Sequence, residues 1–220
     1  MSPSPFRLLA LADSAFPAGG FAHSYGLEAH ASHGAVRSAA DVGRFVVDSV
    51  WQAACAQGPL VRGGHERPGE LGALDQLAEI RTSSAVQNRA SRTQGRTFFA
   101  TARGIFADEL ASLSGAVRAL EHVHHAPVFG ATLAALGLAL DEALTLFLFG
   151  HARGVLSAAV RLGLVGPHES QGLLDELAPV LAEARDEARD RPLSEAAATS
   201  PLLDLRAGLH DALYSRLFLS

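Results

Sequence analysis

Residues 8–36 read LLALADSAFPAGGFAHSYGLEAHASHGAV, and this stretch decides the expected fold of the N-terminal part of the chain. It opens with apolar residues at helical spacing, and Asp13 and Ser14 end this run. Pro17 follows, and proline lacks a backbone donor and disfavours a helical conformation just before it. Gly19 and Gly20 permit positive φ and close approach of another backbone. Helix formers resume at residues 27–29, so we predict a helix, a shaped turn and a second helix.

The second piece carries an unusually polar face that is rich in ring side chains. Two interpretations fit such a face: a solvated connection between helices, or a surface that binds a ligand or a partner. The residues that form it are His23, Tyr25, Glu28, His30 and His33.

Composition indicates one globular unit. The chain has 220 residues, of which 48% are hydrophobic, and we predict a single domain over residues 1–220. The longest apolar run, residues 131–150, is broken by Asp141 and Glu142, so no membrane span is expected, and the start MSPSPFRLL lacks the pattern of a secretory signal. The single Cys55 cannot form an internal disulfide, which suits a reducing compartment, and a cytoplasmic location is expected.

The charged residues exclude several classes of function. The net charge is −5 without any basic block, so nucleic-acid binding is not expected. All 18 basic residues are arginine, and the absence of lysine excludes Schiff-base catalysis and a P-loop lysine. No GxSxG, GxxxxGK or GxGxxG motif occurs, so neither a nucleophile elbow nor a phosphate-binding loop is indicated.

The rest of the chain shows helical periodicity and no strand alternation, which predicts an all-α, single-domain helical bundle of roughly eight to ten helices. Ser38 and Asp41 resemble a capping box at the start of a helix over residues 39–57, which Gly58 and Pro59 should end. Further expected segments are a loop over 62–70, helices over 71–80, 98–123, 131–138, 140–161 and 173–181, a mobile segment over 183–200 and an amphipathic tail over 201–220.

Three arginines share one helical face, because Arg89, Arg92 and Arg96 are spaced by three and four residues. Such a face is either solvated or faces an anionic surface of a partner protein.

The chain contains ten histidines, which raises the hypothesis of a metal site. His30 and His33 have a spacing that suits two ligands on one helix, and His122, His124 and His125 are close in sequence. There is no HExxH or CxxC motif, so we predict no dedicated metal site. A histidine-rich helical metal carrier or a metal-dependent enzyme stays open as an alternative function.

The residues Asp13 to Glu28 form the pattern D-S-A-x-P-x-G-G-F-x-H-S-x-G-L-E, which resembles the N-terminal signature of the UreF family of urease accessory proteins. Residues 125–130, 156–162 and 205–220 resemble later segments of the same family in the same order. Two departures occur: only Gln171 remains of a glutamine-rich turn at 166–171, and Asp211 follows His210 in place of glutamate.

The resemblance implies a non-catalytic, all-α protein that forms a homodimer. It further implies a bridge between UreD (also called UreH) and the GTPase UreG, modulation of the UreG GTPase cycle, and gated delivery of nickel to the urease apoprotein. No tightly bound cofactor is implied, since nickel is handled transiently by the complex. The residues expected to bind partners are Pro17, Gly19, Gly20, His23, Ser24, Tyr25, Glu28, Arg161, His210, Arg216, Leu217 and Phe218.

Two of these expectations concern separate parts of the chain. Arg161 is expected to contact UreG, although an arginine at this position could also complement a helix dipole. The tail over residues 201–220 is expected to bind UreD, with Arg216, Leu217 and Phe218 as anchors and residues 183–200 as a tether. Packing of the tail against the protein's own core is the alternative, because so short a helix needs a surface to pack against.

Overall fold

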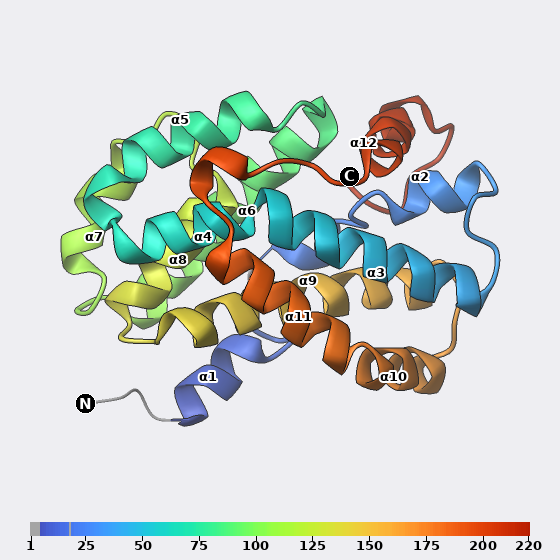
Figure 1. Ribbon diagram of the computed structural model, residues 1–220, viewed down its shortest axis with the longest axis horizontal. Helices are drawn as coiled ribbons and strands as arrows, with labels where there is room; N and C mark the ends of the chain where they lie inside the picture. Colours follow the sequence, from blue (N-terminus) through green and yellow to red (C-terminus); the bar gives the residue numbers. More distant parts are fainter. Residues whose placement is uncertain (1–4, 18) are drawn as a thin grey trace.

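The computed structural model describes residues 5–17 and 19–220, so residues 1–4 and Ala18 of the predicted domain lie outside it. Within these ranges the chain forms α-helices, short 3-10 helices and no β-strand, which confirms the predicted all-α class (Figure 1). The α-helices outnumber the eight to ten that we predicted, because turns divide several segments that looked continuous.

In chain order the elements are α1 (Pro5–Ala12), η1 (Gly20–Ala22), α2 (Leu27–Ser32), α3 (Ala39–Ala56), α4 (Gly58–Glu66), η2 (Pro68–Glu70), α5 (Leu71–Arg81), α6 (Ala85–Ile105), α7 (Ala111–Arg118), α8 (His125–Ala135), α9 (Leu140–Arg161), α10 (Pro167–Glu176), α11 (Ala178–Asp190), η3 (Leu193–Glu195), α12 (Pro201–Gly208) and η4 (Leu209–Ala212).

The predicted helix, turn and second helix are confirmed in α1, η1 and α2. Just after α1, the Asp13 Oδ1 atom accepts a hydrogen bond from the Ala15 backbone N–H at 2.6 Å. Gly19 precedes η1 with φ 78°, and Gly26 precedes α2 with φ 86°. Because these left-handed conformations favour glycine, the turn depends on glycine at both positions. Gly20 does not have a positive φ.

The predicted stop at Gly58 and Pro59 is confirmed, because α3 ends at Ala56 and a separate helix begins at Gly58. The predicted loop over residues 62–70 is wrong. Most of these residues form α4 and η2. Pro59 lies in the first turn of α4, where a backbone N–H has no acceptor within the helix, so proline removes no helical hydrogen bond there. The glycines in α4 let this helix approach α8 closely. A Cβ on Gly64 would overlap the carbonyl oxygen of Pro127. Glycine therefore marks a helix contact here rather than a loop.

The predicted continuous helix over residues 98–123 is also wrong. α6 ends at Ile105 and α7 begins at Ala111, and the break lets both helices place apolar side chains in one core. A second break precedes α8. There the buried Asp75 carboxylate accepts hydrogen bonds from the backbone N–H groups of residues 122–124, which holds this segment in a non-helical conformation.

Two groups of buried apolar side chains hold the helices together. One lies mainly among α3, α4, α9 and α11, and the other mainly among α6, α7, α8 and the first half of α9. Phe129 of α8 packs against both. α9 is long and apolar enough to cross a membrane by length and composition, but 56% of its apolar window is buried inside the protein, as in a core helix.

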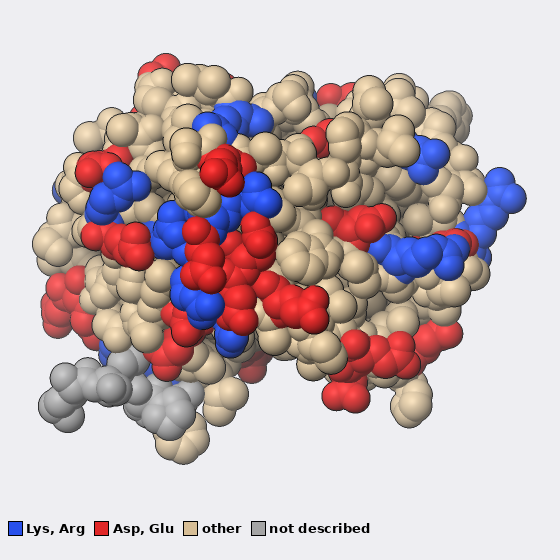
Figure 2. Space-filling view, in the orientation of Figure 1, with Lys and Arg blue, Asp and Glu red and all other residues tan. Residues whose placement is uncertain are grey.

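The segment over residues 183–200, which we expected to be mobile, is helical in its first part. Residues 183–190 belong to α11, whose Ala184 and Ala188 are fully buried, and Ala196 is buried farther along. Small side chains let this charged segment pack closely against α3, α4 and α9. Its charged side chains pair with one another, so acidic and basic groups are interspersed on the face of α11 seen in Figure 2.

The tail over residues 201–220 is not one amphipathic helix. α12 and η4 end at Ala212, and the chain continues to Ser220 without regular structure. Several leucines of the predicted stripe face solvent, whereas Phe218 is buried with 4% of its surface exposed. α12 lies beside α2 (Figure 1), so the tail packs against the N-terminal part of the chain.

Candidate functional site

The signature segment, residues 13–28, and the end of the tail meet through backbone hydrogen bonds. The Leu219 N–H donates to the Ala22 carbonyl oxygen at 2.8 Å, and the Ser24 N–H donates to the Ser220 oxygen at 2.6 Å. The Ser24 hydroxyl donates to the same Ser220 oxygen at 2.8 Å. Two regions that the sequence suggested separately therefore form one site.

Glu28 is the centre of this junction. Its buried carboxylate accepts hydrogen bonds from the Leu217 N–H at 2.6 Å and the Phe218 N–H at 3.2 Å. His210, which is fully buried, places Nε2 3.0 Å from Glu28 Oε2. A buried carboxylate is costly unless hydrogen-bonded, so these donors from the tail stabilise Glu28 where it lies.

His23 extends the junction to the last residue of the sequence. Its Nδ1 lies 2.6 Å from the Ser220 hydroxyl oxygen, while its Nε2 is buried without a hydrogen-bond partner. Burial is the largest cause that lowers the pKa of His23 to about 4, and nearby His210 lowers it further. His23 is therefore a neutral imidazole at neutral pH, with an unpaired ring nitrogen.

Arg161 lies at the edge of the same site. Its guanidinium is stacked between two rings, 3.9 Å from the centroid of Phe21 and 4.0 Å from that of Phe218, and it donates to the Phe21 carbonyl oxygen. Arg161 thus contacts both the signature segment and the tail, so its role is not limited to complementing the dipole of α9.

The three expected anchors of the tail point in different directions. Phe218 faces inward onto Arg161, whereas Leu217 is 55% exposed, and Arg216 is exposed and pairs with Asp211 at 3.5 Å. The ring of Phe218 is buried in the chain itself, and its role as an anchor for UreD stays a prediction.

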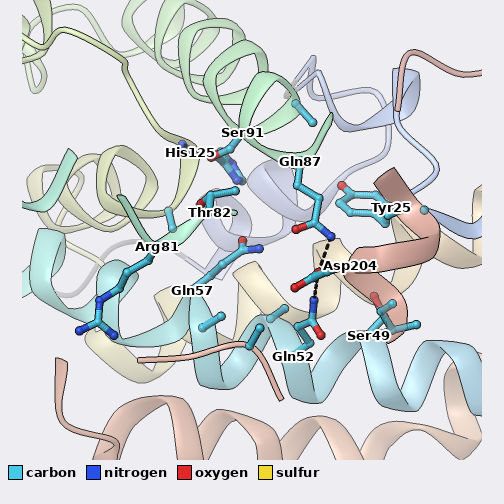
Figure 3. A pocket seen from close by; sticks show the side chains of 18 of the residues that line it. Tyr25, Ser49, Gln52, Gln57, Arg81, Thr82, Gln87, Ser91, His125 and Asp204 are labelled. Atoms are coloured by element: carbon cyan, nitrogen blue, oxygen red, sulfur yellow. Dashed lines mark hydrogen bonds between the residues drawn. The ribbon is translucent and has the colours of Figure 1, made fainter. Parts of the chain in front are cut away.

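A cavity of about 320 Å³ lies behind the junction, and Figure 3 shows the side chains around it. It is lined by small apolar residues and by polar side chains from α3, α6, α8, α9 and α12. Asp204 of α12 accepts hydrogen bonds from the amides of Gln52 at 2.5 Å and Gln87 at 2.8 Å (Figure 3). We call this space the histidine cavity, because His23, His125 and His151 line it.

Tyr25 lines both the histidine cavity and a second cavity of about 210 Å³. Its ring meets His151 edge-on at 4.6 Å and fits against Gly154, where a Cβ would lie 2.7 Å from the ring. The backbone of Tyr25 has φ 56°, an unfavourable conformation for a residue other than glycine. Burial raises the pKa of its hydroxyl to about 12.

The other two cavity histidines are also neutral at neutral pH. Burial lowers the pKa of His125 and of His151 to about 4. His151 Nε2 lies 2.7 Å from the Ser49 hydroxyl. Among residues 5–17 and 19–220, no group of three or more His, Cys, Asp or Glu side chains is arranged to hold a metal ion. The three histidines therefore offer uncharged polar contacts, whereas Asp204 and Arg81 bring charged groups to the wall of the cavity.

Pro17, Gly19 and Gly20 of the expected site line the second cavity. Pro17 also accepts a hydrogen bond from the Thr101 hydroxyl at 2.9 Å. The cavity-lining side chains of Ser49, His151 and Asp204 were missed by sequence reasoning. A signal existed only for His151, which follows the apolar run over residues 143–150 of α9.

Other histidines that the sequence singled out lie elsewhere. His30 and His33 pair with backbone oxygens of Gly26 and Ala29 at 2.9 and 2.7 Å. His124 lies 2.9 Å from Glu79 and lines neither cavity.

The arginine face of α6 is neither free nor simply solvated. Its three members contact the chain itself: Arg89 pairs with Asp211, Arg92 pairs with Glu79, and Arg96 donates to the His122 carbonyl oxygen.

The sequence was compared with known proteins. The model of the UreF family matches residues 36–178. The chain is 34% identical over 215 residues to urease accessory protein F of Oryza sativa subsp. indica, covering 94% of this chain and 82% of that protein. It is 34% identical over 216 residues to urease accessory protein F of Arabidopsis thaliana, covering 96% and 90%. It is 33% identical over 218 residues to urease accessory protein UreF of Cereibacter sphaeroides, covering 99% of each.

The chain belongs to the UreF family of urease accessory proteins. This confirms the resemblance that the signature segment suggested. The family model begins after the signature segment, whereas similarity to the full-length relatives spans nearly the whole chain. The junction between the signature segment and the tail is therefore a feature of a UreF-family protein, and the partner-binding roles of its residues stay predictions.

Proposed function

We propose that this UreF-family protein is a non-catalytic scaffold of urease assembly. It forms a homodimer, bridges UreD (UreH) and the GTPase UreG, modulates the UreG GTPase cycle and supports nickel insertion into the urease apoprotein. It binds no cofactor tightly, and nickel is handled transiently by the cytoplasmic complex.

The observation that carries this proposal is the outward face of the tail. The backbone of residues 217–219 is held by Glu28 and Ala22, so the tail has a defined shape before any partner binds. Its outer face exposes large apolar side chains, which a docking partner can cover. These are Leu202, Leu205, Leu209, Tyr214, Leu217 and Leu219. We assign this face to UreD.

The Arg161 stack supports a second contact. A guanidinium held between two rings is a fixed cationic group, which suits an acidic surface of a partner such as UreG. Arg161 and the tail's outer face would then bind different partners.

The basis for the homodimer is weaker than the sequence suggested. Glycines at 130, 137, 150 and 154 lie in the apolar part of the chain and would permit close approach of another helix. Gly130 and Gly154 instead contact α4 and Tyr25 of the same chain. A Cβ on Gly137 or Gly150 would meet nothing within 4 Å, so those two positions do not disfavour a dimer. Sedimentation at micromolar concentration tests this directly, and a monomer would contradict it.

The central experiment is co-purification with UreG, UreD and urease apoprotein. The double variant Leu217→Ser and Leu219→Ser removes two exposed apolar side chains without touching Phe218 or His210. We expect it to remain folded and to lose UreD. Ile80→Ser, the same change at an exposed site on α5, is the matched control and should retain UreD. Equal UreD capture by all three proteins would contradict docking at the tail.

Deleting residues 202–220 is a harsher version of this test. The deletion removes the donors that satisfy the buried Glu28 carboxylate, so it should also lower stability. The serine variants are preferable for that reason.

The alternative, a histidine-rich metal carrier or metal-dependent enzyme, rests on the three neutral imidazoles around the two cavities. Purification with stoichiometric, chelator-resistant metal would favour it. Metal-free protein that captures UreG would favour the scaffold.

A further inference from the structure

Among the described residues that line the histidine cavity, Asp204 of α12 has the only acidic side chain. It is half-buried, and Figure 3 shows that it points into the cavity between the amides of Gln52 and Gln87. Both amides donate to the same oxygen, Oδ1, at 2.5 and 2.8 Å. Within the described part of the chain, Oδ2 accepts no hydrogen bond and Asp204 forms no ion pair. One carboxylate oxygen is therefore available to a donor that is not part of the chain.

The basic groups around the cavity do not neutralise Asp204. Apart from the histidines, Arg81 is the only basic residue among the described lining residues. Its guanidinium donates to the backbone oxygens of Ala196 and Ser194, and it points away from Asp204 (Figure 3). The three histidines of the cavity have a pKa of about 4, so they are uncharged at neutral pH. A half-buried carboxylate without a cationic partner is costly, which favours a ligand that brings positive charge.

The wall around Asp204 is mostly apolar and built from small side chains. Ala56 lies one helical turn from Gln52 on α3, and Ala90 lies one turn from Gln87 on α6, so an alanine accompanies each amide. Because such short side chains do not fill the space, the cavity has a volume of about 320 Å³. Small-molecule sites have volumes of roughly 300–1,000 Å³ and carry a few polar groups on apolar walls, and the histidine cavity has both properties.

Gln57 supplies a second polar group for a ligand. Its side chain points into the cavity (Figure 3), and within the described part of the chain it forms no side-chain hydrogen bond. The amide oxygen can accept a hydrogen bond from a ligand, as the Asp204 carboxylate can. Acceptors on the wall suit a planar cation with several N–H groups, because an amidinium or guanidinium binds a carboxylate through two parallel hydrogen bonds.

The histidine cavity meets a surface hollow at Asp204. This hollow has a volume of about 560 Å³ and is lined by residues of α6 and α12 and by residues just before them. Four residues line both spaces, namely Ser83, Val86, Ala198 and Asp204. A ligand can therefore approach the carboxylate from solvent.

We propose that the histidine cavity binds a small organic cation with an apolar body, and that Asp204 is its counter-ion. The cationic group donates N–H hydrogen bonds to the carboxylate, and the body packs against the alanines of α3 and α6. A divalent metal fits less well, because residues 5–17 and 19–220 contain no group of three or more His, Cys, Asp or Glu side chains that could hold one. The proposal requires no partner protein, so it can fail or succeed independently of the scaffold function.

The probe is benzamidine, an amidinium group on a small apolar ring, titrated into the full chain by isothermal titration calorimetry. We expect saturable one-to-one binding with a Kd of about 1 mM or lower. Benzamide has nearly the same shape without the charge, so it should bind at least tenfold more weakly. No binding of benzamidine at about 10 mM, or equal binding of the two compounds, overturns the proposal.

The variant Asp204→Asn removes the charge and keeps the shape of the side chain, and its amide oxygen can still accept hydrogen bonds from Gln52 and Gln87. It should weaken benzamidine binding at least tenfold. Asp211→Asn is the matched control, because Asp211 is an exposed carboxylate that borders the same surface hollow and pairs with Arg89. The control should bind benzamidine at the wild-type level. Undiminished binding by folded Asp204→Asn, or an equal loss in both variants, overturns the proposal.

Ala90→Leu is an independent test that keeps Asp204 and serves if Asp204→Asn does not fold. Ala90 lines the cavity and is half-buried, so leucine at this position extends a larger side chain into the space. We expect loss of benzamidine binding together with the wild-type circular dichroism spectrum. Wild-type affinity in the folded Ala90→Leu protein would place the ligand outside the histidine cavity and overturn the proposal.

Discussion

Gly130→Ala tests the close contact between α4 and α8. Gly130 lies in α8, facing α4, where an added Cβ would overlap the Val61 carbonyl oxygen and lie 2.8 Å from its carbon. The same Cβ would lie 3.0 Å from the His65 backbone nitrogen. Because all of these atoms are backbone, no side-chain rotation can relieve the overlap, and α4 and α8 must move apart.

Two effects oppose each other in this variant. Alanine in place of glycine within a helix stabilises by about 0.5–1 kcal/mol. Overpacking of a close contact costs about 1–3 kcal/mol, and more when backbone must move. We expect the second effect to win, with a net loss of roughly 2 kcal/mol in the free energy of unfolding. For a chain of this size, that lowers Tm by roughly 4–8 °C.

The assay is urea denaturation followed by circular dichroism, supported by thermal scans. Gly115→Ala is the matched control, because it lies in α7 with nothing within 4 Å of the added Cβ. The control should gain about 0.5–1 kcal/mol, so the two variants should change stability in opposite directions. Equal stabilisation by both would refute the account of α4–α8 packing.

Three further predictions concern the site. His23, His125 and His151 have a pKa of about 4 in the folded protein, below the 6.5 of an exposed imidazole, so the unfolded state binds more protons between these two values. The free energy of unfolding should therefore fall by up to about 1.4 kcal/mol per pH unit per group as the pH drops from 6.5 to 4. An unchanged urea midpoint from pH 7 to pH 5 would contradict this. Arg161→Ala should reduce UreG capture and lower the free energy of unfolding by about 1–2 kcal/mol, because both ring contacts are lost. Capture of UreG at the wild-type level would show that the stack has a purely structural role. Gly19→Ala should lower stability by more than about 1 kcal/mol in thermal scans, because φ is 78° and the new Cβ would lie 3.1 Å from that of Thr97; a neutral result would show that the turn relaxes.

Local signals in the sequence were sufficient wherever the chain itself sets the conformation. The capping box at Ser38 and Asp41 begins α3 as predicted. Gly19 has the positive φ that the glycine pair permitted. In both cases the deciding interactions lie within a few residues, so they can be recognised from spacing alone.

Glycine and alanine were the residues most easily misinterpreted. Gly63 and Gly64 suggested a loop, and alanines at 184, 188 and 196 suggested a mobile segment, yet all of them lie at close contacts in the interior. A small residue is compatible with a turn and with tight packing, and only the neighbouring element decides between the two.

By itself, the sequence determined the all-α class, the family and most of the residues at the junction, because helical periodicity, caps and motifs are properties of neighbouring residues. Only the tertiary structure decided that Glu28 binds the tail, that Arg161 stacks between Phe21 and Phe218, and that Phe218 faces inward. Those contacts join opposite ends of the chain. Such pairings depend on how the helices pack, and the spacing of residues within one segment carries no information about them.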